Sequence, residues 1–216
     1  MSENQNSAVA DVPETLPPLT VVYRGLGPVQ ACRLSAALYT AGVRSFEVTM
    51  TGDRPMEAIE RLSRELSDDA VVGAGTVTTA DEAAAAAAAG AGFIVSPHFD
   101  PQVVARTRAE GLLSVPGALT PTEIMAARSA GADVVKVFPI NAVGADYIHQ
   151  LRGPMPDLTV MASGGVTPAL AAEVVATGAA CIAVGSHLLG AAVDGSHDPG
   201  ELRDRTGEFL RAVGAS

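Results

Sequence analysis

Tryptophan is absent from this chain of 216 residues, and basic residues are scarce. Lysine and arginine total 14 against 24 acidic residues, which gives a formal net charge of -10 at pH 7. The arginines are scattered along the chain and form no basic stripe. Because a surface of this sign repels phosphate backbones and anionic lipids, we expect neither nucleic acid nor a membrane among the partners.

Cysteine is nearly as rare, since only Cys32 and Cys181 occur, each within an apolar segment. Two cysteines can build neither a disulfide framework nor a four-ligand zinc site, so we expect a reducing, cytoplasmic location. The four histidines, His98, His149, His187 and His197, form no H-E-x-x-H or H-x-H cluster. The sequence therefore predicts no dedicated metal site.

No stretch of the chain is long and apolar enough for a membrane helix, and residues 1–18 lack the basic start and apolar run of a signal peptide. We expect those residues to form a flexible N-terminal tail. The remainder, residues 19–216, contains enough apolar material for one domain, because 48% of the chain is hydrophobic.

Short apolar runs recur through this domain at intervals of roughly 20 to 26 residues. The eight runs cover residues 19–24, 45–50, 70–77, 93–97, 112–117, 133–139, 158–165 and 181–186. Segments of helical composition lie between them, most opening with Pro, Asp or Thr and closing with Gly. Nearly continuous apolar strands that alternate with helices are typical of parallel β/α units, and eight of them predict a single (β/α)8 TIM barrel. The alternative, an open doubly wound sheet, usually has a G-x-G-x-x-G loop, which RGLGPVQ after the first run lacks.

Lys136 is the only lysine of the chain, and it stands within the apolar run DVVKVFP. Both faces of such a strand are buried, where an unpaired ammonium is costly and desolvation favours the neutral amine. A neutral amine attacks a ketone to form a Schiff base, so Lys136 is a candidate nucleophile. The alternative is a lysine paired with a carboxylate in the barrel core.

Glu47 is the matching anomaly, a carboxylate in the middle of the second run, SFEVTM. By alternation it shares a strand face with Thr49 and Thr51 and can point into the barrel. Next to an imine-forming lysine, a glutamate can transfer protons during formation of the imine and cleavage of a carbon-carbon bond. A salt bridge to Lys136 is the other interpretation.

Glycines follow the seventh and eighth runs, in SGG (163–165) and GSH (185–187). The loops after strands seven and eight are the usual phosphate site of this fold, because glycines let backbone N–H groups approach an anion closely. Ordinary turn chemistry is the alternative for either loop alone. GAGT (73–76) brings the hydroxyl of Thr76 to the end of the third strand, although this pattern by itself is weak.

Seven motifs in order, GVRSFEVTM, VVGAGTV, GFIVSPHFD, SVPGALTPTE, VVKVFPINAVG, ASGGVTP and AVGSHLL, resemble the 2-keto-3-deoxy-6-phosphogluconate and 4-hydroxy-2-oxoglutarate aldolase family. The resemblance implies a class I aldolase that forms pyruvate, with Lys136 as Schiff-base lysine and Glu47 as proton shuttle. It assigns the substrate carboxylate to Thr76 and the phosphate to the backbone around Gly164, Gly165, Gly185 and Ser186. Phe138 and Ser163, at the ends of the sixth and seventh strands, join the predicted substrate-binding residues.

The chain departs from the family at Thr51, where many members carry an arginine that binds the substrate carboxylate. Arg24, after the first strand, or Arg54, in the TGDRP turn, are the two candidates to supply this charge. We include Arg24 and Thr51 among the predicted substrate-binding residues. The family implies a homotrimer, a small 2-oxo acid as substrate and no cofactor beyond the imine.

The predicted reaction is the reversible cleavage of a 4-hydroxy-2-oxo acid to pyruvate and an aldehyde. The aldehyde is glyceraldehyde 3-phosphate from the phosphorylated sugar acid, or glyoxylate from 4-hydroxy-2-oxoglutarate. Two alternatives use the same glycine loops without an imine. One is a phosphate-dependent barrel isomerase or synthase, and the other is a non-catalytic barrel that binds sugar phosphates.

Overall fold

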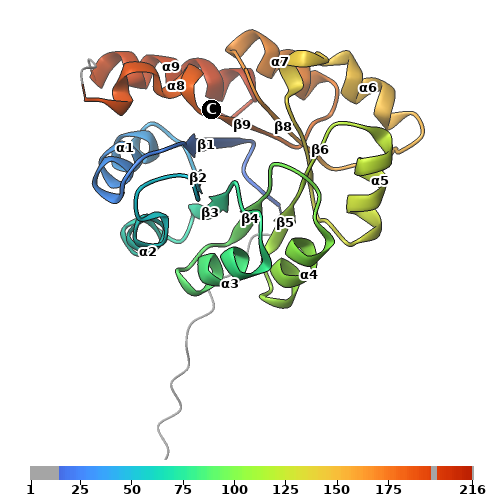
Figure 1. Cartoon of the computed structure of the whole chain (residues 1–216). Helices are drawn as coiled ribbons and strands as arrows, with labels where there is room; N and C mark the ends of the chain where they lie inside the picture. The colour runs from blue at the N-terminus through green and yellow to red at the C-terminus, as the bar shows by residue number, and fades with distance from the viewer. Residues whose placement is uncertain (1–14, 196–198, 216) are drawn as a thin grey trace, which may run out of the picture.

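The computed structural model describes residues 15–195 and 199–215, in which parallel strands alternate with helices around a ring (Figure 1). The strands are β1 (Leu19–Tyr23), β2 (Ser45–Thr49), β3 (Val71–Gly75), β4 (Phe93–Val95), β5 (Leu113–Val115), β6 (Gly117–Ala118), β7 (Val135–Val137), β8 (Val160–Ser163) and β9 (Cys181–Val184). The helices are α1 (Pro28–Thr40), α2 (Pro55–Glu65), α3 (Ala80–Ala88), α4 (Pro101–Ala109), α5 (Pro121–Ser129), η1 (Ile140–Ala142), α6 (Asp146–Arg152), α7 (Pro168–Ala176), α8 (Ser186–Leu189), η2 (Gly190–Val193) and α9 (Pro199–Ala212).

The sheet runs in the order β5-β4-β3-β2-β1-β9-β8-β7-β6, and its two edges meet at Pro116. The amide of Ser96 in the β4 region donates to the carbonyl of Val115, and Lys136 of β7 donates to the carbonyl of Pro116. Proline has no N–H and interrupts the ladder, so the fifth predicted strand is divided into β5 and β6. The chain thus passes from pairing with β4 to pairing with β7. The predicted barrel is confirmed, with nine strands among the described residues in place of eight.

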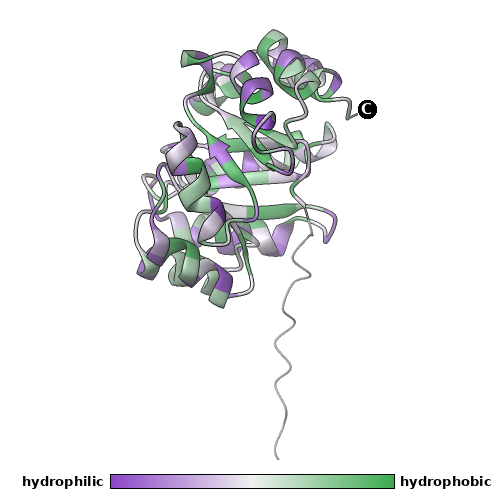
Figure 2. Ribbon diagram, turned by 90° about the vertical axis from the view of Figure 1, so that its right-hand side faces the viewer, coloured by the Kyte–Doolittle hydropathy of each residue, from purple (hydrophilic) through white to green (hydrophobic). Residues whose placement is uncertain are grey.

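Two apolar clusters occupy the two faces of this sheet. The outer cluster fills the space between strands and helices, with Val21, Tyr23 and Phe46 among its members. The inner cluster, which includes Val22, Phe93 and Met161, fills the barrel. In Figure 2 the strands are mostly coloured as hydrophobic, while the surrounding helices alternate between hydrophobic and hydrophilic residues.

Helix starts agree with the signals in the sequence. The hydroxyl of Thr79 accepts a hydrogen bond from the amide of Glu82 at the start of α3, and Thr120 does the same for Glu123 at α5. In both helices the glutamate side chain accepts in return from the backbone of the capping threonine, which satisfies two otherwise unpaired amides. Segment 140–152, to which the sequence analysis assigned no element, forms η1 and the short α6.

The expected tail, residues 1–18, lies outside the described residues as far as residue 14. The rest of it contacts the barrel: Leu16 is buried in the inner cluster, and the carbonyl of Pro18 accepts a hydrogen bond from Ile182. Leu16 and Pro18 of the expected tail therefore contact the barrel. In the part of the chain that the structure describes, no helix has the length and hydrophobicity to cross a membrane.

Candidate active site

Lys136 lies on β7 and faces the interior of the barrel. Its register partners are Gly117 on β6 and Met161 on β8, and Met161 belongs to the inner cluster. The lysine is 6% exposed and lines a cavity of about 380 Å³. Its Nζ atom lies 5.4 Å from the centre of the Phe138 ring, within the range of a cation–π contact. The amine is therefore shielded from bulk water but open to a small molecule in the cavity.

Glu47 lies on β2 and faces the same interior, because its register partner Val22 on β1 also belongs to the inner cluster. The glutamate is 1% exposed, and its Oε2 atom finds no hydrogen-bond partner among the described residues. No ion pair joins Glu47 to Lys136 in the described part of the chain, so the salt-bridge interpretation is not what the structure contains. A buried carboxylate oxygen without a partner is costly, and this is typical of a group that acts on a substrate.

Gly75, the last residue of β3, leaves the space that the Glu47 carboxylate occupies. A Cβ atom at this position would lie 1.8 Å from Oε1 and 2.5 Å from Cδ of Glu47. Real atoms do not approach so closely, so any larger residue would displace the carboxylate. The glycine in GAGT has a packing role next to Glu47, which the sequence analysis did not identify.

The cavity unites most of the predicted substrate-binding residues at the carboxyl ends of four strands. Its walls come from β1, β7, β8, β9 and the segment after β9: Val22, Arg24, Lys136, Phe138, Ser163, Gly164, Gly165, Val166, Val184, Gly185, Ser186, His187, Leu189 and Val193. Glu47, Thr51 and Thr76 are not on its walls. Glu47 shares the interior, whereas Thr51 and Thr76 follow the neighbouring strands β2 and β3.

Thr76 has a left-handed backbone conformation, with φ of 57°. This region is unfavourable for a β-branched side chain, and such strain is often found at functional sites. Thr76 directly follows Gly75 and is half-buried at the end of β3. Its position directly after Gly75, which lies against the Glu47 carboxylate, is compatible with the predicted role in binding a substrate carboxylate.

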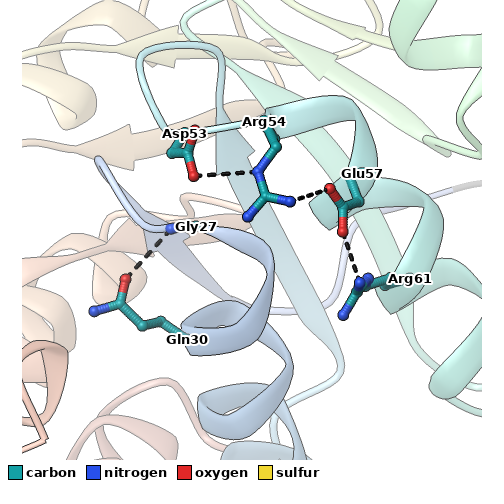
Figure 3. Close-up of polar contacts among 6 residues, drawn as sticks. All are labelled: Gly27, Gln30, Asp53, Arg54, Glu57 and Arg61. Atoms are coloured by element: carbon teal, nitrogen blue, oxygen red, sulfur yellow. Dashed lines mark hydrogen bonds and ion pairs between the residues drawn. The ribbon is translucent and has the colours of Figure 1, made fainter.

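Besides Thr76, three residues were considered in connection with the substrate carboxylate, Arg24, Thr51 and Arg54, and they differ in the contacts that they already make. Arg54 is exposed and bonded to Asp53 and Glu57, and Glu57 in turn pairs with Arg61 (Figure 3). The hydrogen bond to Asp53, with the charge of Glu57, raises the pKa of Arg54.

Thr51 is also exposed, and its hydroxyl lies 3.0 Å from the hydroxyl of Thr49. The Thr49 hydroxyl in turn donates a hydrogen bond to the backbone carbonyl of Tyr23. Arg24, in contrast, is on the cavity wall and forms no ion pair with the described part of the chain. The geometry therefore favours Arg24.

Two consecutive glycines follow β8 and form one wall of the cavity. Gly164 and Gly165 have φ values of 97° and 64°, a conformation in which side chains are strained. A Cβ at Gly165 would also lie 2.4 Å from Nδ2 of Asn141. Gly165 and Val166 lie in the loop after β8, and their amides donate no hydrogen bond to another part of the described chain. These N–H groups are therefore available to an anion.

Neither thiol is suited to act as a nucleophile. Burial raises the pKa of Cys181, inside the barrel, to about 12. Burial, with a contribution from Glu65, raises the pKa of Cys32 to about 11. Because the thiolate is the reactive form, both stay protonated at neutral pH. Among the described residues there is also no group of histidines, cysteines and carboxylates that could hold a metal ion.

Part of the cavity wall was not predicted from the sequence. His187, which belongs to the predicted GSH loop but was not among the predicted substrate-binding residues, lines the cavity beside Ser186. The apolar wall residues Val22, Val166, Val184, Leu189 and Val193 were not predicted either. Alternation from Thr20 through Val22 to Arg24 was a usable signal for Val22, but nothing in the sequence pointed to Val193.

Comparison with known proteins agrees with this geometry. Residues 19–201 match the sequence profile described as "Aldolase: KDPG and KHG aldolase". The chain belongs to the KDPG and KHG aldolase family. These proteins are carbon-carbon lyases, and membership therefore decides against the isomerase or synthase alternative.

Curated relatives include the 2-dehydro-3-deoxy-6-phosphogalactonate aldolase of Escherichia coli (strain K12), 34% identical over 81% of this chain and 86% of its own length. The 2-dehydro-3-deoxy-phosphogluconate aldolase of Treponema pallidum (strain Nichols) is 35% identical over 85% of this chain and 88% of its own. A solved structure titled "Native KDPGal structure" superimposes with a TM-score of 0.84 and 31% identity, covering 92% of this chain and 95% of the other. The likeness extends over nearly the whole barrel.

Proposed function

We propose that this aldolase cleaves a 2-keto-3-deoxy-6-phospho sugar acid to pyruvate and glyceraldehyde 3-phosphate through an imine on Lys136. The observation that carries the proposal is the placement of the only lysine on a cavity wall inside the barrel. The names of the relatives support phosphorylated gluconate or galactonate derivatives as substrates. Unphosphorylated 4-hydroxy-2-oxoglutarate, which would give pyruvate and glyoxylate, is a second candidate.

The reaction begins when neutral Nζ of Lys136 attacks the C2 carbonyl carbon of the substrate. Loss of water from the carbinolamine gives a protonated imine. Glu47 then removes the proton of the C4 hydroxyl, the C3–C4 bond breaks, and its electron pair moves toward the iminium nitrogen. The aldehyde leaves at this point, and an enamine of pyruvate remains on Lys136.

The enamine is protonated at C3, and water hydrolyses the resulting pyruvate imine to free the lysine. Glu47, which returns the proton that it took, has no other partner for Oε2 in the described chain. The Phe138 ring beside Nζ provides an apolar wall that also tolerates the positive charge of the iminium. No metal or organic cofactor takes part in this scheme.

Reductive trapping tests the imine directly. Incubation with pyruvate and borohydride should leave a single reduced adduct, because the chain offers no lysine besides Lys136. Peptide mass spectrometry should locate the adduct on that residue. Absence of an adduct, or an adduct only on the N-terminal amine, contradicts the proposed mechanism and revives the non-catalytic binding protein as the alternative.

Arg24 is the residue that we propose to bind the substrate carboxylate in place of an arginine at Thr51. Arg24→Gln removes a charge-assisted hydrogen bond, so KM for pyruvate in the condensation direction should rise by roughly 10- to 100-fold. The same enzyme assay on Arg54→Gln provides a matched control. Its guanidinium is already bonded to Asp53 and Glu57, and its KM should stay near the wild-type value. An equal rise in both variants, or none in Arg24→Gln, would refute the assignment.

The phosphate is proposed to bind at the wall formed by Gly164, Gly165, Gly185 and Ser186. The open amides of Gly165 and Val166 support an anion there. We further propose a homotrimer, which follows from the family resemblance and can be measured by light scattering. Two free thiols support a location in a reducing compartment such as the cytoplasm.

A further inference from the structure

Residues 186–193, which form α8 and η2 directly after β9, make up one wall of the cavity. Ser186, His187, Leu189 and Val193 of this segment all line it. The segment is short and irregular, with four residues in α8 and four in η2. Such a segment has few hydrogen bonds of its own, so its position depends on contacts with the rest of the barrel.

Three long side chains from two helices donate hydrogen bonds to the backbone of this segment. Arg205 of α9 donates from Nη2 to the carbonyl of Leu189, and Arg33 of α1 donates from Nη2 to the carbonyl of Ala192, each at 3.2 Å. Gln30 of α1 donates from Nε2 to the carbonyl of Val193, also at 3.2 Å. Two of the three bonded carbonyls, those of Leu189 and Val193, therefore belong to residues that line the cavity.

The fit around Arg205 is close. Gly190 follows Leu189 with φ of 50°, and a Cβ at Gly190 would lie 2.6 Å from Nη1 of Arg205. The guanidinium thus packs directly against the backbone where α8 ends, and it satisfies a carbonyl that the end of a helix leaves unpaired. Leu188 and Ala192, which belong to the segment, are fully buried. Their burial anchors the apolar side of the segment.

We infer that Arg33 and Arg205, assisted by Gln30, are positioning residues that hold the 186–193 segment as the wall for the phosphorylated end of the substrate. This inference rests on the proposed function. None of the three residues lines the cavity, so they act through the segment and not on the substrate. A segment released from these bonds adopts its binding position for only part of the time, and the apparent affinity falls by that fraction.

The test compares Arg205→Met, Arg33→Met and the double variant with Arg203→Met. Methionine keeps an unbranched stem but has no donor. Arg203 is on the same helix, is 76% exposed, and pairs in the described chain only with its neighbour Asp204, so it controls for loss of a charge on α9. KM and kcat are measured with 2-keto-3-deoxy-6-phosphogluconate, its galactonate counterpart and 4-hydroxy-2-oxoglutarate, and folding is followed by circular dichroism.

We expect KM for the better phosphorylated substrate to rise roughly tenfold in each single variant, as for a wall that is in place about a tenth of the time. KM should rise further in the double variant, while kcat stays within about twofold of wild type. The KM for 4-hydroxy-2-oxoglutarate, which has no phosphate, should change little. Arg205→Lys, which retains a donor, should recover part of the affinity.

If the wild-type enzyme is active, two kinds of result from the variants would overturn the inference. One is an unchanged KM in a folded double variant. The other is an equal loss for phosphorylated and unphosphorylated substrates, or a fall in kcat, which would indicate general destabilisation. A wild-type protein that neither forms the pyruvate adduct nor cleaves any of the substrates would refute the proposed function itself, and this inference with it.

Discussion

Lys136→Met should abolish aldol cleavage, lowering kcat by roughly 10⁴-fold or more, because the variant has no amine with which to form the imine. Such a loss corresponds to about 5.5 kcal/mol of transition-state stabilisation. Methionine matches the unbranched apolar stem of lysine and removes a polar amine from a site that is 6% exposed. The fold should therefore survive, with a thermal midpoint no lower than that of the wild type.

The measurement combines steady-state cleavage, pyruvate trapping with borohydride and thermal unfolding. Trapping should fail completely in Lys136→Met, because no other lysine is present. Residual turnover above about 1% of wild type in a well-folded Lys136→Met protein would exclude covalent catalysis by this residue. Lys136→Arg provides a second test, since a guanidinium is a long basic side chain that does not act as an amine nucleophile.

Glu47→Gln should lower kcat by roughly 10²- to 10⁴-fold, the usual contribution of general acid-base catalysis. Glutamine has the shape of glutamate, so the contact with Gly75 is retained and the fold should be unaffected. Pyruvate should still be trapped on Lys136, although more slowly if Glu47 also assists loss of water from the carbinolamine. Near wild-type turnover in the folded variant would return Glu47 to a structural role.

Gly75→Ala reaches the same carboxylate by displacement, because the added Cβ would stand 1.8 Å from Oε1 of Glu47. We expect kcat to fall by roughly 10²-fold. In the Glu47→Gln background, however, the same change should cost little more, since the base is already gone. Gly73→Ala is the control on the same strand, because its Cβ would meet the Phe93 ring instead, at 2.4 Å. Additive losses in the double variant would show that Gly75 acts through general stability.

Much of the fold could be predicted from the sequence, because its signals are local. Parallel strands buried on both faces must be apolar, and Thr79 and Thr120 cap α3 and α5 through hydrogen bonds that lie within four residues of chain. Pro116 interrupts the strand locally because it has no N–H, but the change of strand partner at this point is not a local property. That the ladder changes partners there depends on where β4 and β7 lie.

The candidate site was predictable where a residue was anomalous for its strand. A single lysine and a glutamate in apolar runs are visible without a structure, and strand alternation allows Glu47 to point into a barrel. That Lys136 also faces the interior came from the register of β7 with Met161 of the inner cluster. The contact between Gly75 and Glu47 was not predictable, because it joins neighbouring strands whose register is set by the whole sheet. The choice between Arg24 and Arg54 likewise depended on which guanidinium is already bonded to acidic neighbours.

The sequence by itself predicted the barrel, and its family resemblance implied aldol chemistry. It also singled out Lys136 and Glu47 as the candidates to carry that chemistry, since burial of charged side chains in apolar strands is unfavourable unless they have a function. Only the tertiary structure decided that Glu47 and Lys136 are not paired with each other, and that Gly75 makes room for a carboxylate. It alone revealed that the wall at residues 186–193 is held by Arg33 and Arg205, which are remote in sequence. Such contacts depend on distances across the fold, which no pattern of neighbouring residues encodes.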